Sequence, residues 1–374
     1  MNEQNQFELI GRDFNELREL VAKEEQPSYR AQQLFEGIYR QRVASVVEIS
    51  TLPQALRQVL EEKSFHIGLP GVENKFASRD GTERYLLRFA DGHSVETVWM
   101  PQGDEGEAGD GSEAGDELEK RTSWDRATIC VSSQAGCAVD CRFCLTALLG
   151  LRRNLTAGEI VGQIAVVLRD QRVSPARQRV NLVFMGMGEP FLNYDNLIKA
   201  VHLLADGVQI PASRMTVSTV GIVPRITDFG REALRPKLAI SLNASNDELR
   251  TALMPVNRKW NLAKLMAAAR QFPLRPREKL TFEYVLLDHV NDSETNAREL
   301  VELIRGLQAK VNLIALNPGP GITFRTPPRE RVLRFQSILL AGGVPAFIRR
   351  PRGRDIYAAC GQLKRTRDLM KPML

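Results

Sequence analysis

The middle of the chain alternates between short apolar runs and amphipathic segments, which is typical of strands followed by helices. Six strands are expected, at 127–132, 180–185, 215–219, 237–242, 280–287 and 311–316. Helices are expected near 156–169, 193–205, 246–253, 261–271, 293–309 and 328–341, the first opened by a capping box of Thr156 and Glu159. A short strand at 346–349 and a helix after Asp355 complete the pattern.

Regular alternation of strands and helices predicts parallel strands joined by crossover helices. Six such units are fewer than the eight of a closed barrel. We therefore predict an α/β fold built around a partial (βα)6 TIM-type barrel. In such a fold the site lies at the carboxyl ends of the strands.

The first hundred residues follow a different pattern. Apolar residues at helical spacing before residue 64 predict a small helical module, and strict alternation from residue 74 to 100 predicts strands. The acidic stretch that follows has almost no apolar content, so we expect a disordered insertion. The predicted organisation is an N-terminal helical accessory domain (1–72) that binds RNA, a β linking element (73–101), an acidic insertion (102–123), the core barrel (124–355) and a C-terminal segment (356–374).

Composition narrows the class of protein. With 374 residues, 43% of them apolar, the chain can form sizeable cores. No apolar run approaches the length of a membrane span, and the N-terminus lacks the pattern of a secretory signal, so we expect a cytoplasmic protein. The net charge is +6 although residues 102–119 hold eight acidic residues and no Lys or Arg, so the rest is strongly basic. That charge suits a polyanionic partner, but an ordinary soluble basic protein would show it too.

The cysteines carry the most specific signal. Three of them, Cys137, Cys141 and Cys144, are spaced C-x3-C-x2-C in one short polar loop. Structural zinc sites usually have four ligands, and no fourth His or Cys lies nearby. Three thiolates leave one iron of a [4Fe–4S] cube open to a small molecule, whereas clusters are normally held by four cysteines. We interpret the loop as a cluster site; the alternative is a zinc site that borrows a distant ligand.

Polar residues also follow the other predicted strands. The loop Met185–Pro190 offers two glycines for close approach to a ligand and Glu189 as an acceptor for an ammonium group. Three further strands end in Ser218, in Ser241–Asn243 and in Asn317. Each is weak alone, but together they surround one barrel mouth.

Three more residues have two interpretations each. Cys130 lies inside the first strand, where a buried small apolar residue is as plausible as a catalytic thiol. Glu96 lies on an alternating strand, where a carboxylate ordinarily faces water. Cys360 is followed by a glycine and preceded by four nearby arginines (Arg349, Arg350, Arg352 and Arg354), which favour a reactive thiolate.

Together these residues closely resemble the RlmN/Cfr family of radical S-adenosylmethionine (SAM) enzymes, which methylate adenine in RNA. The resemblance covers nearly the whole chain from about residue 8. The matching stretches are Val95–Val98, Arg126–Gln134, Gly136–Cys144, Met185–Pro190, Glu283–Asp292 and Ala359–Leu363.

The resemblance implies a role for each candidate residue. Cys137, Cys141 and Cys144 would hold the [4Fe–4S] cluster. The SAM contacts would be Gly188, Glu189, Ser218, Ser241, Leu242, Asn243 and Asn317. Cys360 would be the cysteine that becomes S-methylated, Cys130 its resolving partner in a disulfide, and Glu96 the proton acceptor.

The implied activity is methylation of carbon 2 of adenine in 23S rRNA, in the peptidyl-transferase region, and in tRNA 3′ of the anticodon, with two SAM per turnover. One alternative is methylation of carbon 8, as in the Cfr branch; another is a non-catalytic RNA-binding protein stabilised by zinc. We expect a monomer with no membrane association that takes electrons from flavodoxin or ferredoxin. Two residues depart from the family pattern, Asn243 where many relatives have His and Val220 where they often have Ser.

Overall fold

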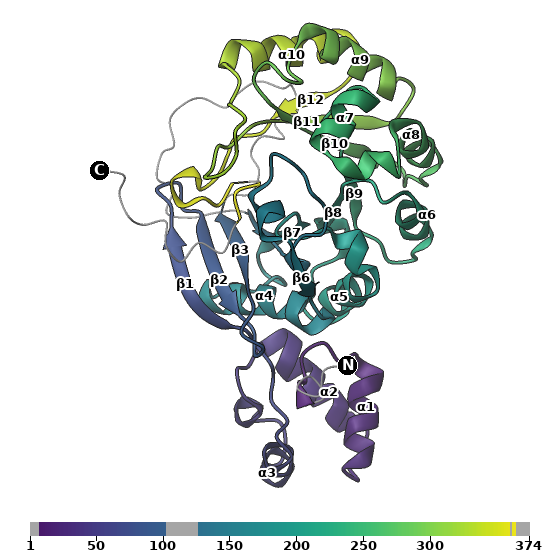
Figure 1. Cartoon of the computed structure of the whole chain (residues 1–374). Helices are drawn as coiled ribbons and strands as arrows, with labels where there is room; N and C mark the ends of the chain where they lie inside the picture. The colour runs from purple at the N-terminus through teal and green to yellow at the C-terminus, as the bar shows by residue number, and fades with distance from the viewer. Residues whose placement is uncertain (1–6, 102–125, 360, 364–374) are drawn as a thin grey trace, which may run out of the picture.

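The computed structural model describes residues 7–101, 126–359 and 361–363 (Figure 1). Its centre is one ten-stranded sheet, in the order β1-β2-β3-β4-β7-β8-β9-β10-β11-β12. The strands are β1 (Gly71–Ala77), β2 (Glu83–Arg88), β3 (Ser94–Pro101), β4 (Arg126–Cys130), β7 (Arg179–Phe184), β8 (Met215–Thr219), β9 (Lys237–Ser241), β10 (Leu280–Leu286), β11 (Ala309–Ala315) and β12 (Ala346–Ile348). The acidic stretch 102–123, Cys360 and the chain after Leu363 lie outside the described residues.

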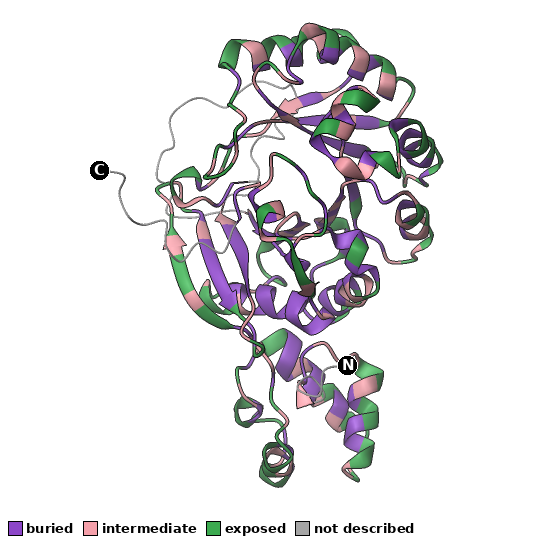
Figure 2. Cartoon of the chain, viewed as in Figure 1, coloured by how far each residue is buried: buried purple, intermediate pink, exposed green. Residues whose placement is uncertain are grey.

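The strands from β4 to β12 all run parallel to their neighbours. Helices connect them on the outer side of the curved sheet, and Figure 2 shows that the strands are mostly buried. These helices are α4 (Ala157–Asp170), α5 (Tyr194–Asp206), α6 (Val223–Arg231), α7 (Asp247–Leu253), α8 (Leu262–Gln271), α9 (Glu294–Ile304) and α10 (Arg329–Ala341). The predicted partial (βα)6 barrel is confirmed, and β12 continues it.

Strands β1 to β3 extend the same sheet in antiparallel sense beyond β4. Val98 pairs with Cys130, and Met100 pairs with Thr128. Because alternate residues of a strand share a face, Glu96 lies on the same face of the sheet as Cys130. That face is the inside of the barrel, since Met100, Thr128 and Cys130 line a cavity there.

The N-terminal helices pack against the outside of the barrel, at the bottom of Figure 1. The hydroxyl of Tyr39 accepts a hydrogen bond from the Gly11 amide (2.9 Å) and donates one to the Arg12 carbonyl (2.7 Å). A Cβ at Gly11 would lie 2.7 Å from Cα of Gly158 in α4, so the backbone can approach the barrel this closely only because both residues are glycine. The elements are α1 (Phe14–Lys23), α2 (Tyr29–Phe35), a π-helix (Glu36–Gln41), a 3-10 turn (Val46–Glu48) and α3 (Gln54–Glu62).

Several predictions of local structure were wrong. The helix predicted over 293–309 ends at Ile304, because the chain turns at Gly306 with a φ of +78°. Helix α6 was missed since it contains a proline, which is tolerated in a first turn. In place of a helix after Asp355, Arg354–Ile356 forms a single 3-10 turn, and no further helix follows in 357–359 or 361–363. Within the described ranges no helix has both the length and the apolarity needed to cross a bilayer.

Candidate functional site

The cysteine loop is held at its base by a small hairpin that the sequence pattern did not reveal. Its strands are β5 (Gln134–Gly136) and β6 (Leu151–Asn154), which are antiparallel and outside the main sheet. Gly136 has a φ of +84°, and a Cβ there would lie 1.9 Å from the Gly150 carbonyl oxygen. Only glycine allows this approach, so the residue before Cys137 is fixed by geometry.

All three cysteines of the loop line one cavity of about 160 Å³. Burial, with a smaller contribution from the charges of Cys144 and Glu189, raises the pKa of Cys137 to about 12. Burial raises the pKa of Cys141 as well. Thiols in this position ionise readily only when a metal offsets the cost, which fits thiolate ligands of a metal centre.

The arrangement fits a cluster better than a single ion. Among the described residues, no three His, Cys, Asp or Glu side chains converge as the ligands of one metal ion do. In an iron–sulfur cube each thiolate binds a different iron, so the three sulfurs need not converge on one point. The surface of the cavity is mostly apolar, which shields a cluster from water.

Glu189 lies in the wall of the same cavity, after β7. Its carboxylate accepts hydrogen bonds from the backbone amides of Phe191 (3.0 Å) and Val220 (2.8 Å). Burial nevertheless raises its pKa to about 7. Before it, Gly188 has a φ of +100°, and a Cβ there would lie 2.5 Å from Cβ of Gln134. The loop can therefore lie directly against the cysteine hairpin.

The other predicted SAM contacts come from the ends of β8, β9 and β11. The hydroxyls of Ser218 and Ser241 lie 3.2 Å apart, and both residues line the cavity with Asn243 and Asn317. Leu242 does not line it; its side chain is fully buried in the core. Among the described residues, the cavity therefore includes every predicted cluster ligand and every predicted SAM contact except Leu242.

Asn243, where many relatives have His, is held by its backbone conformation and by two side-chain hydrogen bonds. Its φ of +58° is left-handed, a conformation that Asn tolerates better than most residues. The side-chain oxygen accepts a hydrogen bond from the Val285 amide (2.8 Å), and the side-chain nitrogen donates one to the sulfur of Met254 (3.3 Å). Asn243 thus joins the ends of β9 and β10 beside the cavity.

Glu96 and Cys130 lie away from the cysteine cavity. Cys130 lines a second, adjoining cavity, whereas Glu96 is fully buried and lines neither. The Glu96 carboxylate pairs with Arg84 of β2 at 2.8 Å, and burial lowers the pKa of that arginine. No pattern in the sequence indicated this partner, which lies twelve positions away on a neighbouring strand.

Cys360 lies outside the described residues, but its neighbours in the chain are placed. Ala359 lines the second cavity and Gly361 lines the cysteine cavity. The Gly361 carbonyl accepts a hydrogen bond from the Leu145 amide (2.8 Å), and the Leu363 carbonyl accepts one from the Thr146 hydroxyl (2.8 Å). The C-terminal segment is therefore attached to the residues that directly follow the third cysteine.

Two further polar residues hold the site together. Arg250 of α7 is fully buried and donates hydrogen bonds to the carbonyls of Leu242 (3.1 Å) and Val220 (2.7 Å). Burial lowers its pKa to about 10, an effect that the nearby Cys141 opposes. Ser132 joins β3, the Met185–Pro190 loop and α4 by hydrogen bonds. A lone Arg in an amphipathic helix and a Ser after a strand are both ordinary in sequence, so neither stood out.

Comparisons with known proteins agree with this geometry. Residues 131–301 match the Radical SAM superfamily. The chain is 66% identical over 341 residues to the probable dual-specificity RNA methyltransferase RlmN of Koribacter versatilis, which covers 91% of this chain and 97% of that protein. The chain belongs to the RlmN family.

A second curated relative and a solved structure support this assignment. The dual-specificity RNA methyltransferase RlmN of Nitratiruptor sp. is 44% identical over 349 residues, or 93% of this chain and 96% of its own. A solved radical SAM methyltransferase from Sphaerobacter thermophilus has a TM-score of 0.86 and 42% identity, and covers 96% of this chain and all of its own. Radical-SAM enzymes use a [4Fe–4S] cluster and SAM, and the three cysteines and Glu189 of this RlmN-family chain suit both.

Proposed function

We propose that this protein methylates carbon 2 of adenine in RNA by radical-SAM chemistry, through an S-methylcysteine on Cys360. The observation that carries the proposal is the cavity in which three cysteines and Glu189 lie together. The relatives named dual-specificity RNA methyltransferases support RNA as the substrate.

The chain's own residues would divide the work. Cys137, Cys141 and Cys144 would hold the cluster. Glu189 would accept a hydrogen bond from the ammonium group of SAM. The nearby polar residues are Ser218, Ser241, Asn243 and Asn317. When bound, the cluster and SAM supply a 5′-deoxyadenosyl radical, which suits carbon 2 because this electron-poor carbon is a poor nucleophile. Each turnover would need two SAM: one would supply the methyl group placed on Cys360, and the other, held beside the three cysteines and Glu189, would supply the radical.

Glu96 and Cys130 would complete the reaction. One hydrogen of the S-methyl group of Cys360 would pass to the 5′-deoxyadenosyl radical, giving 5′-deoxyadenosine, and the remaining methylene carbon would bond to carbon 2. The substituted ring carbon would then give its proton to Glu96 and one electron back to the cluster. Cys130 would attack the sulfur of Cys360, so that a disulfide forms as the sulfur–carbon bond breaks, and the released carbon would take up a proton to complete the methyl group of the base. The position of Glu96 and Cys130 on one face of the sheet supports these two roles, and the ion pair with Arg84 would hold the Glu96 carboxylate in place.

The RNA substrates we propose are 23S rRNA, in the peptidyl-transferase region, and tRNA, at the adenine 3′ of the anticodon. Target adenines in folded RNA must be extruded to reach such a cavity. The N-terminal helical domain would add RNA contacts. We further propose a cytoplasmic monomer that receives electrons from flavodoxin or ferredoxin.

Mass spectrometry of nucleosides tests the proposal. RNA lacking the modification is incubated anaerobically with cluster-loaded protein, SAM and a reductant, then digested and compared with position-resolved methyladenosine standards. We expect the carbon-2 isomer with the wild type and none with Cys360→Ala. A methyl group only at carbon 8 would favour the Cfr-type reaction. Colourless protein that holds zinc and no acid-labile sulfide would instead indicate the zinc-stabilised RNA-binding protein.

A further inference from the structure

A second cavity, of about 110 Å³, adjoins the cysteine cavity. Cys130 lines it, and so does Ala359, the residue before Cys360. The proposed function makes Cys360 and Cys130 the residues that form and release the bond to RNA. The second cavity is therefore on the side from which RNA must approach. The two cavities share the lining residues Met185, Glu283, Ile314 and Asn317.

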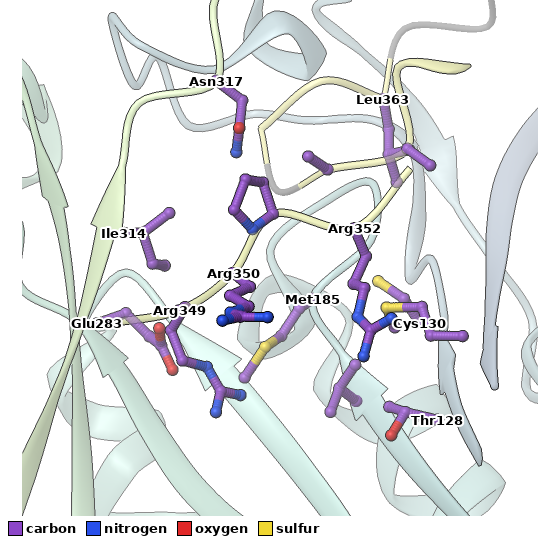
Figure 3. A pocket seen from close by; sticks show the side chains of 15 residues that line it. Thr128, Cys130, Met185, Glu283, Ile314, Asn317, Arg349, Arg350, Arg352 and Leu363 are labelled. Atoms are coloured by element: carbon purple, nitrogen blue, oxygen red, sulfur yellow. The ribbon is translucent and has the colours of Figure 1, made fainter. Parts of the chain in front are cut away.

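Three of the described residues that line this cavity are arginines. Arg349, Arg350 and Arg352, from one short segment after β12, line it, and Figure 3 shows their side chains turned toward its interior. Among the described lining residues Glu283 is the only carboxylate, and it already accepts a hydrogen bond from Asn312 (2.9 Å). Guanidinium groups match the geometry of phosphate oxygens, so the cavity suits an anion of that kind.

The arginine segment is fixed at both ends. The Arg349 amide donates to the Leu313 carbonyl of β11 (2.8 Å), and the Gly353 amide donates to the Asp80 carboxylate in the β1–β2 turn (2.9 Å). The Ser78 hydroxyl of the same turn donates to Asp355 (2.5 Å). A segment tied to both sides of the barrel mouth presents its side chains in a preorganised arrangement, which lowers the entropic cost of binding.

We propose that Arg349, Arg350 and Arg352 bind a backbone phosphate of the RNA next to the target adenosine. This inference rests on the proposed function. It adds that the three arginines set the position of the RNA strand relative to the cavity. The carboxylate of SAM is the other available anion. It is a poorer candidate because Glu189, Ser218 and Ser241 line the cysteine cavity, whereas the three arginines do not.

The test couples one phosphate to one arginine. Short RNA substrates carry a neutral methylphosphonate at each phosphate around the target adenosine in turn. Their affinities are measured with cluster-loaded protein in the absence of reductant, for wild type, R350Q, R352Q and the control R354Q. Arg354 is exposed on the same segment but does not line the cavity.

One methylphosphonate position should weaken wild-type binding about ten- to a hundredfold, the effect of a lost charge-assisted hydrogen bond. A methylphosphonate at that position should cause little further loss of RNA affinity in R352Q or R350Q, which already lack the contact. It should cause the full loss in R354Q. Each cavity variant should also reduce the slope of log affinity against log salt by roughly 0.7, one phosphate contact on single-stranded RNA.

Two results would overturn the proposal. If the losses of RNA affinity caused by the arginine variant and by the methylphosphonate simply add at every position, the arginines contact no single phosphate. A weakened affinity for SAM with unchanged affinity for RNA would assign the arginines to the carboxylate of SAM. The proposed function is judged separately, by the methylated nucleosides. Coupling between an arginine and a phosphate without any methylated adenosine would support the phosphate site and refute the methylation. Methylated adenosine without such coupling would support the methylation and refute the phosphate site.

Discussion

Ser132 joins three segments of the site. Its hydroxyl donates to the Glu96 carbonyl on β3 (2.6 Å) and accepts from the Met187 amide in the loop that carries Glu189 (2.9 Å). Its own backbone amide and carbonyl bind the side chain of Gln163 in α4 (both 3.0 Å). The change Ser132→Ala removes the hydroxyl and leaves the rest of the residue in place.

The expected cost follows from the groups left behind. Without the hydroxyl, the carbonyl of Glu96 and the amide of Met187 remain in a fully buried position with one hydrogen bond fewer each. A buried polar group that loses its partner costs about 1–3 kcal/mol. We therefore expect Ser132→Ala to lower the free energy of unfolding by about 2–5 kcal/mol, and to weaken SAM binding because Met187 precedes the Glu189 loop.

Urea denaturation followed by tryptophan fluorescence measures this cost, since Trp99 is buried on β3. Ser133→Ala is a matched control. Ser133 is also buried, yet among the described residues its hydroxyl has no hydrogen-bond partner, so its removal leaves no other group unpaired and should leave stability unchanged or higher. Equal losses in both variants, or no loss in Ser132→Ala, would refute the reasoning.

Three further predictions concern the buried charges of the site. Burial raises the pKa of Glu189 to about 7, so the carboxylate that binds an ammonium group forms as the pH rises through this value. Calorimetry should therefore find that the SAM affinity of the cluster-loaded wild type increases from about pH 5.5 to about pH 8, with little change in Glu189→Gln. A flat wild-type profile would contradict this. Arg84→Met leaves Glu96 buried without its cation, so urea denaturation should show a loss of about 3–5 kcal/mol in the free energy of unfolding. The double variant Arg84→Met/Glu96→Leu should recover most of this loss. A double variant as unstable as the single one would argue against a buried ion pair. Cys141→Ala should remove the brown colour and the acid-labile sulfide after anaerobic reconstitution, whereas wild-type amounts of both would contradict a cluster at this loop.

The sequence pattern predicted the barrel because each parallel strand is a short apolar run followed by an amphipathic helix. It predicted the cysteine cavity for a related reason: carboxyl ends of parallel strands meet at one edge, so Glu189, Ser218 and Ser241 had to converge. Gly188 was visible as a signal of close approach to a ligand, but its contact with Gln134 and the tight packing of Gly136 were not predicted.

The contacts that depend on pairing across the fold could not be predicted. The partner of Glu96 is set by the register of β2 and β3, which a one-residue slip would reverse. Arg250 occupies an ordinary helical position, and its burial follows only from the way α7 folds back over the ends of β8 and β9. The β5–β6 hairpin is too short for its alternation to stand out.

In the proposed reaction, the methyl carbon carried by one cysteine of this chain is transferred to the RNA base. The intact mass of protein produced in cells with a cluster-assembly system tests it most directly, with peptide fragmentation to locate any added group. We predict that the wild type is heavier by one methylene unit, that the addition lies on Cys360, and that Cys360→Ala lacks it. A wild type with no added mass, or the same addition retained in Cys360→Ala, would contradict the account.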